Sequence, residues 1–296
     1  MKISVIGKGA WGSAMGRALT RNGHEVIYLG RNEREWQSGG AGDFVLLAVP
    51  CQSIRSRLLE LPPPGVAVFS LVKGIEIHSK KRVTEVVEEI WPGHVTGAIS
   101  GPSLASEVEA DSPTALVVAS MDEVWSKLVQ KAIHQRLLRT YRSSDVIGVE
   151  LGGALKNVYA LAGGMCQGLG LGENGLAGLM TRSLGEMMRL AVSLGAKAET
   201  LSGLSGMGDL ILTAYSGESR NHKVGIALGK GRDLQEILRH LNGTAEGVPT
   251  AKAVHELVQE RGIKAPVAEQ IYQVLYKGKT PAEGFKALMM REVSEE

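Results

Sequence analysis

Short apolar runs alternate with amphipathic segments along the first half of the chain. The runs are rich in Val, Ile and Leu and carry few charges, as strands buried in a parallel sheet do. Between them lie segments with helical periodicity, the first ended by Gly23 and the others near residues 52–61, 80–90 and 122–132. This alternation predicts a doubly wound α/β sheet of the Rossmann type. Its strands are expected in the segments KISVI, EVIYL, FVLLAVP, VAVFS, VTGAIS, TALVVAS and LLRTYRS.

One connection in this pattern is unusually short. Only about a dozen residues separate Arg31 from the apolar run that begins at Phe44. That length is close to the minimum for a crossover between parallel strands. We therefore expect the connection to contain only a short helix.

The pattern changes beyond Asp145, where the strand-like runs disappear and long segments rich in small residues take their place. We place a domain boundary there, with a dinucleotide-binding Rossmann domain at residues 1–145. Residues 146–296 are expected to form an all-α substrate and catalytic domain. From about residue 234 onward the pattern is that of amphipathic helices separated by glycine turns.

The composition is ordinary for a globular protein. Hydrophobic residues make up 44% of the chain and charged residues 22%, with a net charge of +2, so no nucleic-acid or membrane partner is predicted. No apolar run approaches the roughly 20 residues of a membrane span, and the N-terminus reads as a strand and not as a signal peptide. We expect a cytoplasmic protein. Cys51 and Cys166 lack ligand spacing, which favours structural thiols and argues against a metal site.

The first strand leads into a glycine-rich turn. Gly7, Gly9 and Gly12 form the pattern G-x-G-x-x-G between a strand and a helix. The first glycine allows the tight turn, the second lets the backbone approach a pyrophosphate, and the third brings helix and strand close. The helix N-terminus then presents free N–H groups to the phosphates. The turn predicts dinucleotide binding.

The end of the second strand bears on which dinucleotide is bound. NAD-selective sites usually place an acidic residue there to hold the ribose 2′-hydroxyl. Here Arg31 follows the strand, with Arg34 nearby, and this favours a 2′-phosphate and hence NADP. Glu33 keeps NAD open, and Arg34 is equally well explained as part of a solvated helix face.

One lysine stands inside an apolar helical segment, VELGGALKNVYALAGG. Lys156 is flanked on its helical face by Gly152, Gly153, Tyr159 and Ala160, so close approach is possible there. A lysine withdrawn from water has a lowered pKa, as a proton donor or acceptor near neutral pH requires. For Lys156 taken alone, a snorkelling lysine with a buried stem and a solvated head is the more common arrangement.

Further polar and small residues follow the strands of the first half. Lys73 comes after the fourth strand, and Gly101, Ser103 and Ala105 come after the fifth. Ligands of open parallel sheets bind outside the carboxyl ends of the strands. These positions are therefore expected to face the same rim.

The second half offers two polar features at helix starts. Asp209 stands in a glycine-bracketed turn and is either a helix N-cap, which is the favoured role for a lone Asp, or a catalytic partner. Ser219, Arg220 and Asn221 precede another helix. A hydroxyl, a guanidinium and an amide at a helix start suit a phosphate, although simple capping with a solvated arginine would use the same residues.

Taken together, these motifs resemble the NAD(P)-dependent glycerol-3-phosphate dehydrogenases of the bacterial biosynthetic type. The likeness runs nearly from end to end, in family order, through GKGAWGSA, LVKGIE, SGPSLASEV, ELGGALKNVYALAGG, LSGMGDLILT, SRNHKVG and AEG. It implies interconversion of dihydroxyacetone phosphate and sn-glycerol 3-phosphate, for phospholipid synthesis. It also implies a helical second half like that of 6-phosphogluconate dehydrogenase, and a homodimer.

The resemblance assigns roles to individual residues. It implies that Lys156 is the catalytic lysine, assisted by Lys73 and Asp209. The implied cofactor contacts are Gly7, Gly9, Ala10, Trp11, Gly12, Arg31, Lys73, Ala105, Arg220, Thr244 and Glu246. The implied substrate contacts are Lys73, Gly101, Ser103, Lys156, Asn157, Asp209, Ser219, Arg220 and Asn221.

The chain departs from the family pattern between the second and third strands, where relatives usually carry a few dozen more residues. We expect this shortening to affect cofactor preference, NADP or NAD with NADP favoured, more than catalysis. Two other functions stay open. A related dehydrogenase could act on a 3-hydroxy acid or 2-dehydropantoate, which the Ser219-Arg220-Asn221 run disfavours. A non-catalytic NADP-binding redox sensor would need neither Lys73, Lys156 nor Asp209.

Overall fold

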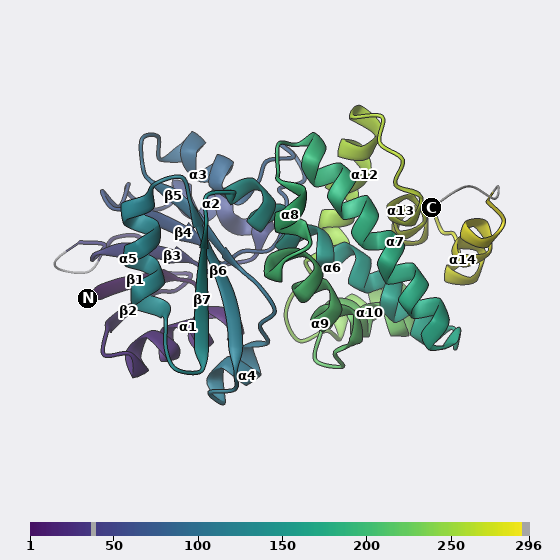
Figure 1. Ribbon diagram of the computed structural model, residues 1–296, viewed down its shortest axis with the longest axis horizontal. Helices are drawn as coiled ribbons and strands as arrows, with labels where there is room; N and C mark the ends of the chain where they lie inside the picture. The colour runs from purple at the N-terminus through teal and green to yellow at the C-terminus, as the bar shows by residue number, and fades with distance from the viewer. Residues whose placement is uncertain (37–39, 292–296) are drawn as a thin grey trace.

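The computed structural model describes residues 1–36 and 40–291. It has a sheet at one end, which contains the N-terminus, and a helical half at the other (Figure 1). The strands are β1 (Lys2–Ile6), β2 (Glu25–Leu29), β3 (Phe44–Leu47), β4 (Val68–Ser70), β5 (Thr96–Ser100), β6 (Thr114–Ser120) and β7 (Leu138–Ser143).

The seven strands lie in the order β2-β1-β3-β4-β5-β6-β7. All neighbouring pairs are parallel except β5 and β6, which run antiparallel. Because the chain runs outward from β1 to β2 and then returns to β3 on the other side, the strand order reverses between β1 and β3. Such a reversal leaves a crevice at the carboxyl ends of the strands, where ligands of these sheets bind.

Two helical layers bury the two faces of the sheet. One apolar core contains residues of α1 and α5, and the other contains residues of α2 and α3. The helices of this half are α1 (Ala10–Arg21), α2 (Ile54–Leu59) after a 3₁₀ turn η1 (Cys51–Ser53), α3 (Val83–Ile90), α4 (Ala105–Glu109) and α5 (Glu123–Ile133).

The prediction of a short helix between β2 and β3 is wrong for the residues of that connection that the structure describes. Residues 30–36 and 40–43 form no helix. A helix covers only about 1.5 Å per residue, less than half the reach of extended chain, so a connection this short can reach β3 more easily without a helical turn. It is tied down by Trp36, whose indole N–H donates to the carbonyl oxygen of Pro62 at 3.0 Å. The ring also lies 6.4 Å from that of Trp91.

The second half is built around one long buried helix, α6 (Val146–Gly168). Its glycines let neighbouring backbones come close: a Cβ at Gly164 would lie 2.8 Å from the amide nitrogen of Ile226, and one at Gly229 would lie 2.6 Å from the carbonyl oxygen of Met165. The small-residue composition thus reflects tight helix packing. Around α6 lie α7 (Gly172–Ser193), α8 (Ala198–Leu201), a π-helical turn η2 (Leu204–Gly208), α9 (Asp209–Tyr215), α10 (Arg220–Gly229), α11 (Leu234–Arg239), α12 (Gly247–Glu260), α13 (Pro266–Tyr276) and α14 (Pro281–Met289).

Helix α6 also joins the two halves. Val146 and Val149, in its first turn, share a small apolar core with Ala98 of β5 and Ala119 of β6. The helix then runs away from the sheet into the centre of the helical half (Figure 1). The predicted fold class, a Rossmann-type sheet followed by an all-α half, is confirmed. Among the described residues, no helix is both long and apolar enough to cross a membrane.

Candidate active site

The glycine turn has the shape that a dinucleotide pyrophosphate requires. Gly7 has a φ of +113°, and a Cβ there would lie 2.6 Å from the carbonyl oxygen of Ala48 in the chain after β3. A Cβ at Gly12 would overlap the carbonyl oxygen of Gly7. A Cβ at Gly9, by contrast, would meet no atom within 4 Å. The turn is therefore closed on its inner side and open at Gly9, the N-cap residue of α1, so the residues present fit the phosphates.

The other residues of the cofactor prediction lie along the same edge. Ala10 begins α1 and Ala105 begins α4. Trp11 is partly buried, and its indole N–H has no protein partner among the described residues. Arg31 is exposed just after β2, with only its carbonyl oxygen engaged within the described chain.

Arg34, in contrast, is already occupied. It donates to the carbonyl oxygen of Arg31 at 2.5 Å and pairs with Glu60 at 3.2 Å. It lies in the connection between β2 and β3, whose described residues form no helix, so its interpretation as part of a solvated helix face is wrong. Arg31 is thus the arginine free to meet a 2′-phosphate.

A cluster of two lysines and one aspartate forms the centre of the site. Lys156 of α6 lies 2.9 Å from Oδ1 of Asp209, and Lys73, on the loop after β4, lies 2.5 Å from Oδ2. Lys156 also donates to the hydroxyl of Thr213 at 2.6 Å, and Lys73 to the carbonyl oxygen of Gly101 at 3.0 Å. Two segments far apart in the sequence thus place their positive charges within hydrogen-bond distance of one carboxylate on a third.

Two expectations about these residues are corrected. The side chain of Lys156 is only 9% exposed and its ammonium is paired, so it does not snorkel into solvent. Asp209 is 1% exposed and begins α9, but it is not the N-cap; Gly208 holds that position. The carboxylate of Asp209 is instead committed to the two lysines.

The pKa of Lys156 is lowered to about 8 from its ordinary value of 10.5. Burial, which disfavours the charged ammonium, is the largest cause. The charge and hydrogen bond of Asp209 raise the pKa again, while the nearby positive charges of Lys73 and Arg220 lower it. The cluster therefore holds a proton donor matched to neutral or slightly alkaline pH.

The small residues beside Lys156 admit other parts of the chain. A Cβ at Gly152 would lie 2.5 Å from the carbonyl oxygen of Ser205 in η2. One at Gly153 would lie 2.5 Å from the hydroxyl of Ser100 and 3.3 Å from the stem of Lys73. The close approach predicted on this face is therefore filled by the protein itself, and it brings Lys73 to Asp209.

The Ser219-Arg220-Asn221 run forms the start of α10. The hydroxyl of Ser219 accepts from the amide of His222 at 3.2 Å and so caps the helix, while Arg220 is exposed. The carboxamide of Asn221 donates to Asn157 at 2.9 Å and accepts from the amide of Gly247 at 2.9 Å. Ser219 thus caps the helix while Arg220 stays accessible. The side chain of Asn221 makes its hydrogen bonds within the protein.

Asn157 continues this chain of amides to the lysine loop. Its nitrogen donates to the carbonyl oxygen of Lys73 at 3.0 Å. Glu246, the residue before Gly247, accepts a hydrogen bond from the amide of Cys51 at 3.2 Å. Its second carboxylate oxygen is buried without a partner in the described residues. Burial raises the pKa of Glu246. Hydrogen bonds at Lys73 and at Cys51 therefore join the two halves.

The remaining predicted residues lie at the edges of this arrangement. Ser103 is partly buried and its hydroxyl donates to the carbonyl oxygen of Gly101 at 2.9 Å. Thr244 is exposed, in the loop before α12. Thr213 is a site residue that the sequence analysis missed; its position four residues after Asp209 on one helix face was the available signal.

Two family models match the chain. The model described as the NAD-dependent glycerol-3-phosphate dehydrogenase C-terminus matches residues 145–286. The model of the N-terminus of the same family matches residues 2–39 and 37–126, two pieces that meet within the short connection between β2 and β3.

Similar proteins cover the full length. A glycerol-3-phosphate dehydrogenase [NAD(P)+] from Moorella thermoacetica is 42% identical over 98% of this chain and 96% of its own length. One from Oleidesulfovibrio alaskensis is 41% identical over all of both chains, in an alignment of 331 residues. The crystal structure of glycerol-3-phosphate dehydrogenase from Coxiella burnetii matches with a TM-score of 0.91 and 31% identity, over 98% of this chain and 99% of that one. A ketopantoate reductase from Ralstonia eutropha, at 17% identity and a TM-score of 0.61 over 96% and 99% of the two chains, shares the fold alone.

Proposed function

Because this chain belongs to the NAD-dependent glycerol-3-phosphate dehydrogenase family, we propose that it interconverts dihydroxyacetone phosphate and sn-glycerol 3-phosphate with NAD(P)H. The observation that carries the proposal is the Lys156–Asp209–Lys73 cluster, built where the strand ends and the helical half meet. Bound NAD(P)H supplies the hydride, and the chain supplies binding, orientation and the proton.

Lys156 is the proposed proton donor. In the direction of reduction, the carbonyl oxygen of the substrate gains negative charge as hydride arrives at the carbon. The ammonium of Lys156 gives that oxygen its proton, which its pKa of about 8 permits near neutral pH. Lys73 adds positive charge beside the oxygen, and Asp209 holds both ammonium groups in place.

The start of α10 is the proposed phosphate site. The guanidinium of Arg220 and the N–H groups of the first turn offer charge-assisted hydrogen bonds to a phosphate. Binding there fixes the distance between phosphate and carbonyl carbon, so the carbonyl is brought to Lys156. A substrate with a carboxylate in place of the phosphate would leave part of this site unused.

We propose that the halves divide this work. Residues 1–145 bind the nucleotide through the glycine turn, Ala10, Trp11 and Ala105, and the second half adds Thr244 and Glu246 to this site. Residues 146–296 bind the substrate, together with Gly101 and Ser103 from the rim of the sheet. Arg31 supports a preference for NADPH over NADH because its guanidinium is not committed elsewhere in the described chain. We further propose a cytoplasmic homodimer, as the family resemblance implies; sedimentation equilibrium of the purified protein tests the dimer.

The experiment is a spectrophotometric assay at the nicotinamide band. Purified protein is mixed with dihydroxyacetone phosphate and either NADPH or NADH, with 2-dehydropantoate as the alternative substrate and Lys156→Met as the matched inactive variant. We expect turnover of the phosphorylated substrate by the wild type alone, faster with NADPH. Turnover of 2-dehydropantoate only, or cofactor binding without any turnover, would overturn the proposal.

A further inference from the structure

The loop that carries Lys73 has no regular secondary structure of its own. It joins β4 to α3, and its backbone from Leu71 to Glu76 forms neither strand nor helix. A reacting group on such a loop has to be fixed by contacts from more rigid elements. Asn157 supplies one such contact from α6, at the carbonyl oxygen of Lys73.

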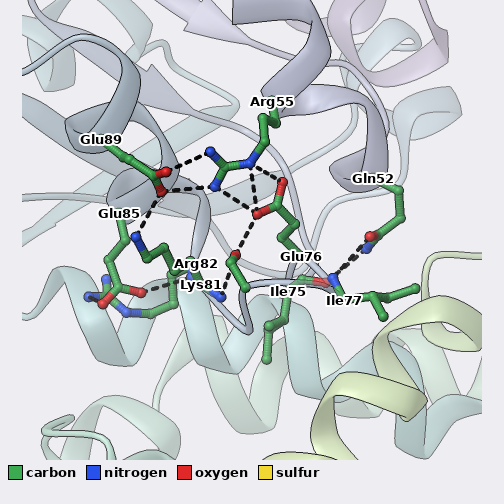
Figure 2. Close-up of polar contacts among 10 residues, drawn as sticks. Gln52, Arg55, Ile75, Glu76, Ile77, Lys81, Arg82, Glu85 and Glu89 are labelled. Carbon is green, nitrogen blue, oxygen red and sulfur yellow. Dashed lines mark hydrogen bonds and ion pairs between the residues drawn. The ribbon is translucent and has the colours of Figure 1, made fainter.

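Gln52 of η1 supplies two further contacts to the loop. Its side-chain nitrogen donates to the carbonyl oxygen of Ile75 at 2.8 Å, and its side-chain oxygen accepts from the amide of Ile77 at 3.1 Å. One carboxamide thus pairs with an acceptor and a donor of the loop backbone, as a neighbouring strand would. Figure 2 shows this double contact.

Arg55 of α2 holds Glu76, the loop residue between Ile75 and Ile77. Its guanidinium donates to both carboxylate oxygens of Glu76, at 2.9 Å from Nε and 2.9 Å from Nη2. Glu76 is only 6% exposed, so the carboxylate is held inside the loop. Arg55 also pairs with Glu89 of α3 at 2.8 Å, and Lys81 pairs with the same carboxylate (Figure 2). The turn formed by η1 and α2 therefore holds three consecutive residues of the loop, Ile75 to Ile77.

We propose that Gln52 and Arg55 form a clamp that positions Lys73, so that its ammonium stays between the carbonyl oxygen of Gly101 and the carboxylate of Asp209. Both act through Lys73 and neither is a catalytic residue. The inference rests on the proposed function, since it assigns the clamp a part in the same reaction. It does not follow from the glycine turn or from the lysine cluster, because neither includes η1 or α2.

The clamp has a consequence that a purely structural contact would not have. The charged groups facing Lys156 are Asp209 of α9, Lys73 and Arg220 of α10. Lys73 lowers the pKa of Lys156 by repulsion and also shares the carboxylate of Asp209. A loosened loop would withdraw Lys73 and leave Asp209 to Lys156 alone. Both changes raise the pKa of Lys156.

The test variant is Gln52→Met, which keeps the side-chain length and removes both hydrogen bonds at an exposed position. It is made alone and in a Lys73→Met background. The control is Lys81→Met, which removes only the outer contact with Glu89. Two quantities are measured: kcat for dihydroxyacetone phosphate against pH, and the titration of Lys156 by NMR of protein labelled with ¹³C at lysine Cε, its signal being the one lost in Lys156→Arg.

We expect Gln52→Met to lower kcat about tenfold at pH 7. It should move the titration of Lys156 from about 8 toward 10.5, whereas Lys81→Met should change neither. In the Lys73→Met background, Gln52→Met should have no further effect on either quantity. An unchanged titration of Lys156 in Gln52→Met, or an equal loss with and without Lys73, would overturn the clamp. Absence of turnover in the wild type would instead contradict the proposed function. The titration of Lys156 in Gln52→Met would then still show whether the clamp positions Lys73.

Discussion

The buried cluster contains two lysines and one aspartate, so it carries one positive charge in excess. Replacing Lys156 with Met removes that excess and keeps a side chain of similar length in the packed helix α6. Asp209 retains its ion pair with Lys73, so no buried charge loses its partner. We therefore predict that Lys156→Met abolishes turnover and at the same time stabilises the protein at neutral pH, as removal of a strained catalytic group can do.

The size of the effect follows from the pKa of Lys156, which falls from 10.5 to about 8 in the folded chain. A shift of this size corresponds to about 3 kcal/mol of unfavourable interaction with the charged lysine. Below pH 8 Lys156 is charged in both the native and the unfolded chain, so the native state carries the whole unfavourable interaction. As pH rises from 8 toward 10.5, the native lysine loses its proton while the unfolded lysine keeps it, and the wild type gains stability. The advantage of Lys156→Met should shrink accordingly.

Urea unfolding, followed by tryptophan fluorescence at pH 7 and pH 10, measures this difference. We expect Lys156→Met to raise the free energy of unfolding by about 3 kcal/mol at pH 7 and by much less at pH 10. Lys127→Met, at an exposed position of α5, is the control and should change it by less than about 0.5 kcal/mol at either pH. A variant that is less stable than the wild type at pH 7, or equally stabilised at both pH values, would refute the excess-charge argument.

Three further variants test other parts of the site. Arg220→Ala should raise the KM for dihydroxyacetone phosphate by about 100-fold, because a charge-assisted contact to the phosphate is lost, and an unchanged KM in initial-rate kinetics would contradict the phosphate assignment. Gly9→Ala should keep the wild-type melting temperature and raise the KM for NADPH about tenfold, because its Cβ would meet only the cofactor. Gly12→Ala, whose Cβ overlaps the carbonyl oxygen of Gly7, should melt several degrees lower. Equal melting temperatures for the two variants would contradict a glycine turn that is open only at Gly9. Arg31→Ala should raise the KM for NADPH about tenfold and leave that for NADH nearly unchanged, and equal effects on the two cofactors would remove Arg31 from the 2′-phosphate site.

Local sequence patterns predicted the strands of the sheet well, because a buried strand needs a short run of apolar residues whatever its neighbours are. They did not predict that β5 and β6 run antiparallel, since direction depends on the path of the chain between strands. They also predicted a helix between β2 and β3 that the described residues do not form. There the reach required of a short segment outweighed the usual preference for a helical crossover.

The site shows the same division. Lys156 and Lys73 stood out by position, one in an apolar helix and the other at a strand end. Asp209 stood out as well, but its pattern alone favoured a cap and only the family resemblance placed it with the lysines, because it is 53 residues from one and 136 from the other in the sequence. Thr213 and Gln52 are uncharged residues whose roles depend entirely on what the fold places beside them.

The shortened connection and the lysine cluster lie on opposite sides of the glycine turn. In the sheet, β2 and Arg31 lie on one side of β1, while β3, β4 and β5, with the Lys73 loop, lie on the other. A dinucleotide whose pyrophosphate meets Gly9 has one nucleoside over each side. With the reacting ring beside Lys156, as proposed, the adenosine would lie over β2. Shortening the chain after β2 would then change the surroundings of the adenosine and leave the groups proposed to move the proton untouched, so we expect cofactor choice to be separable from catalysis in this chain.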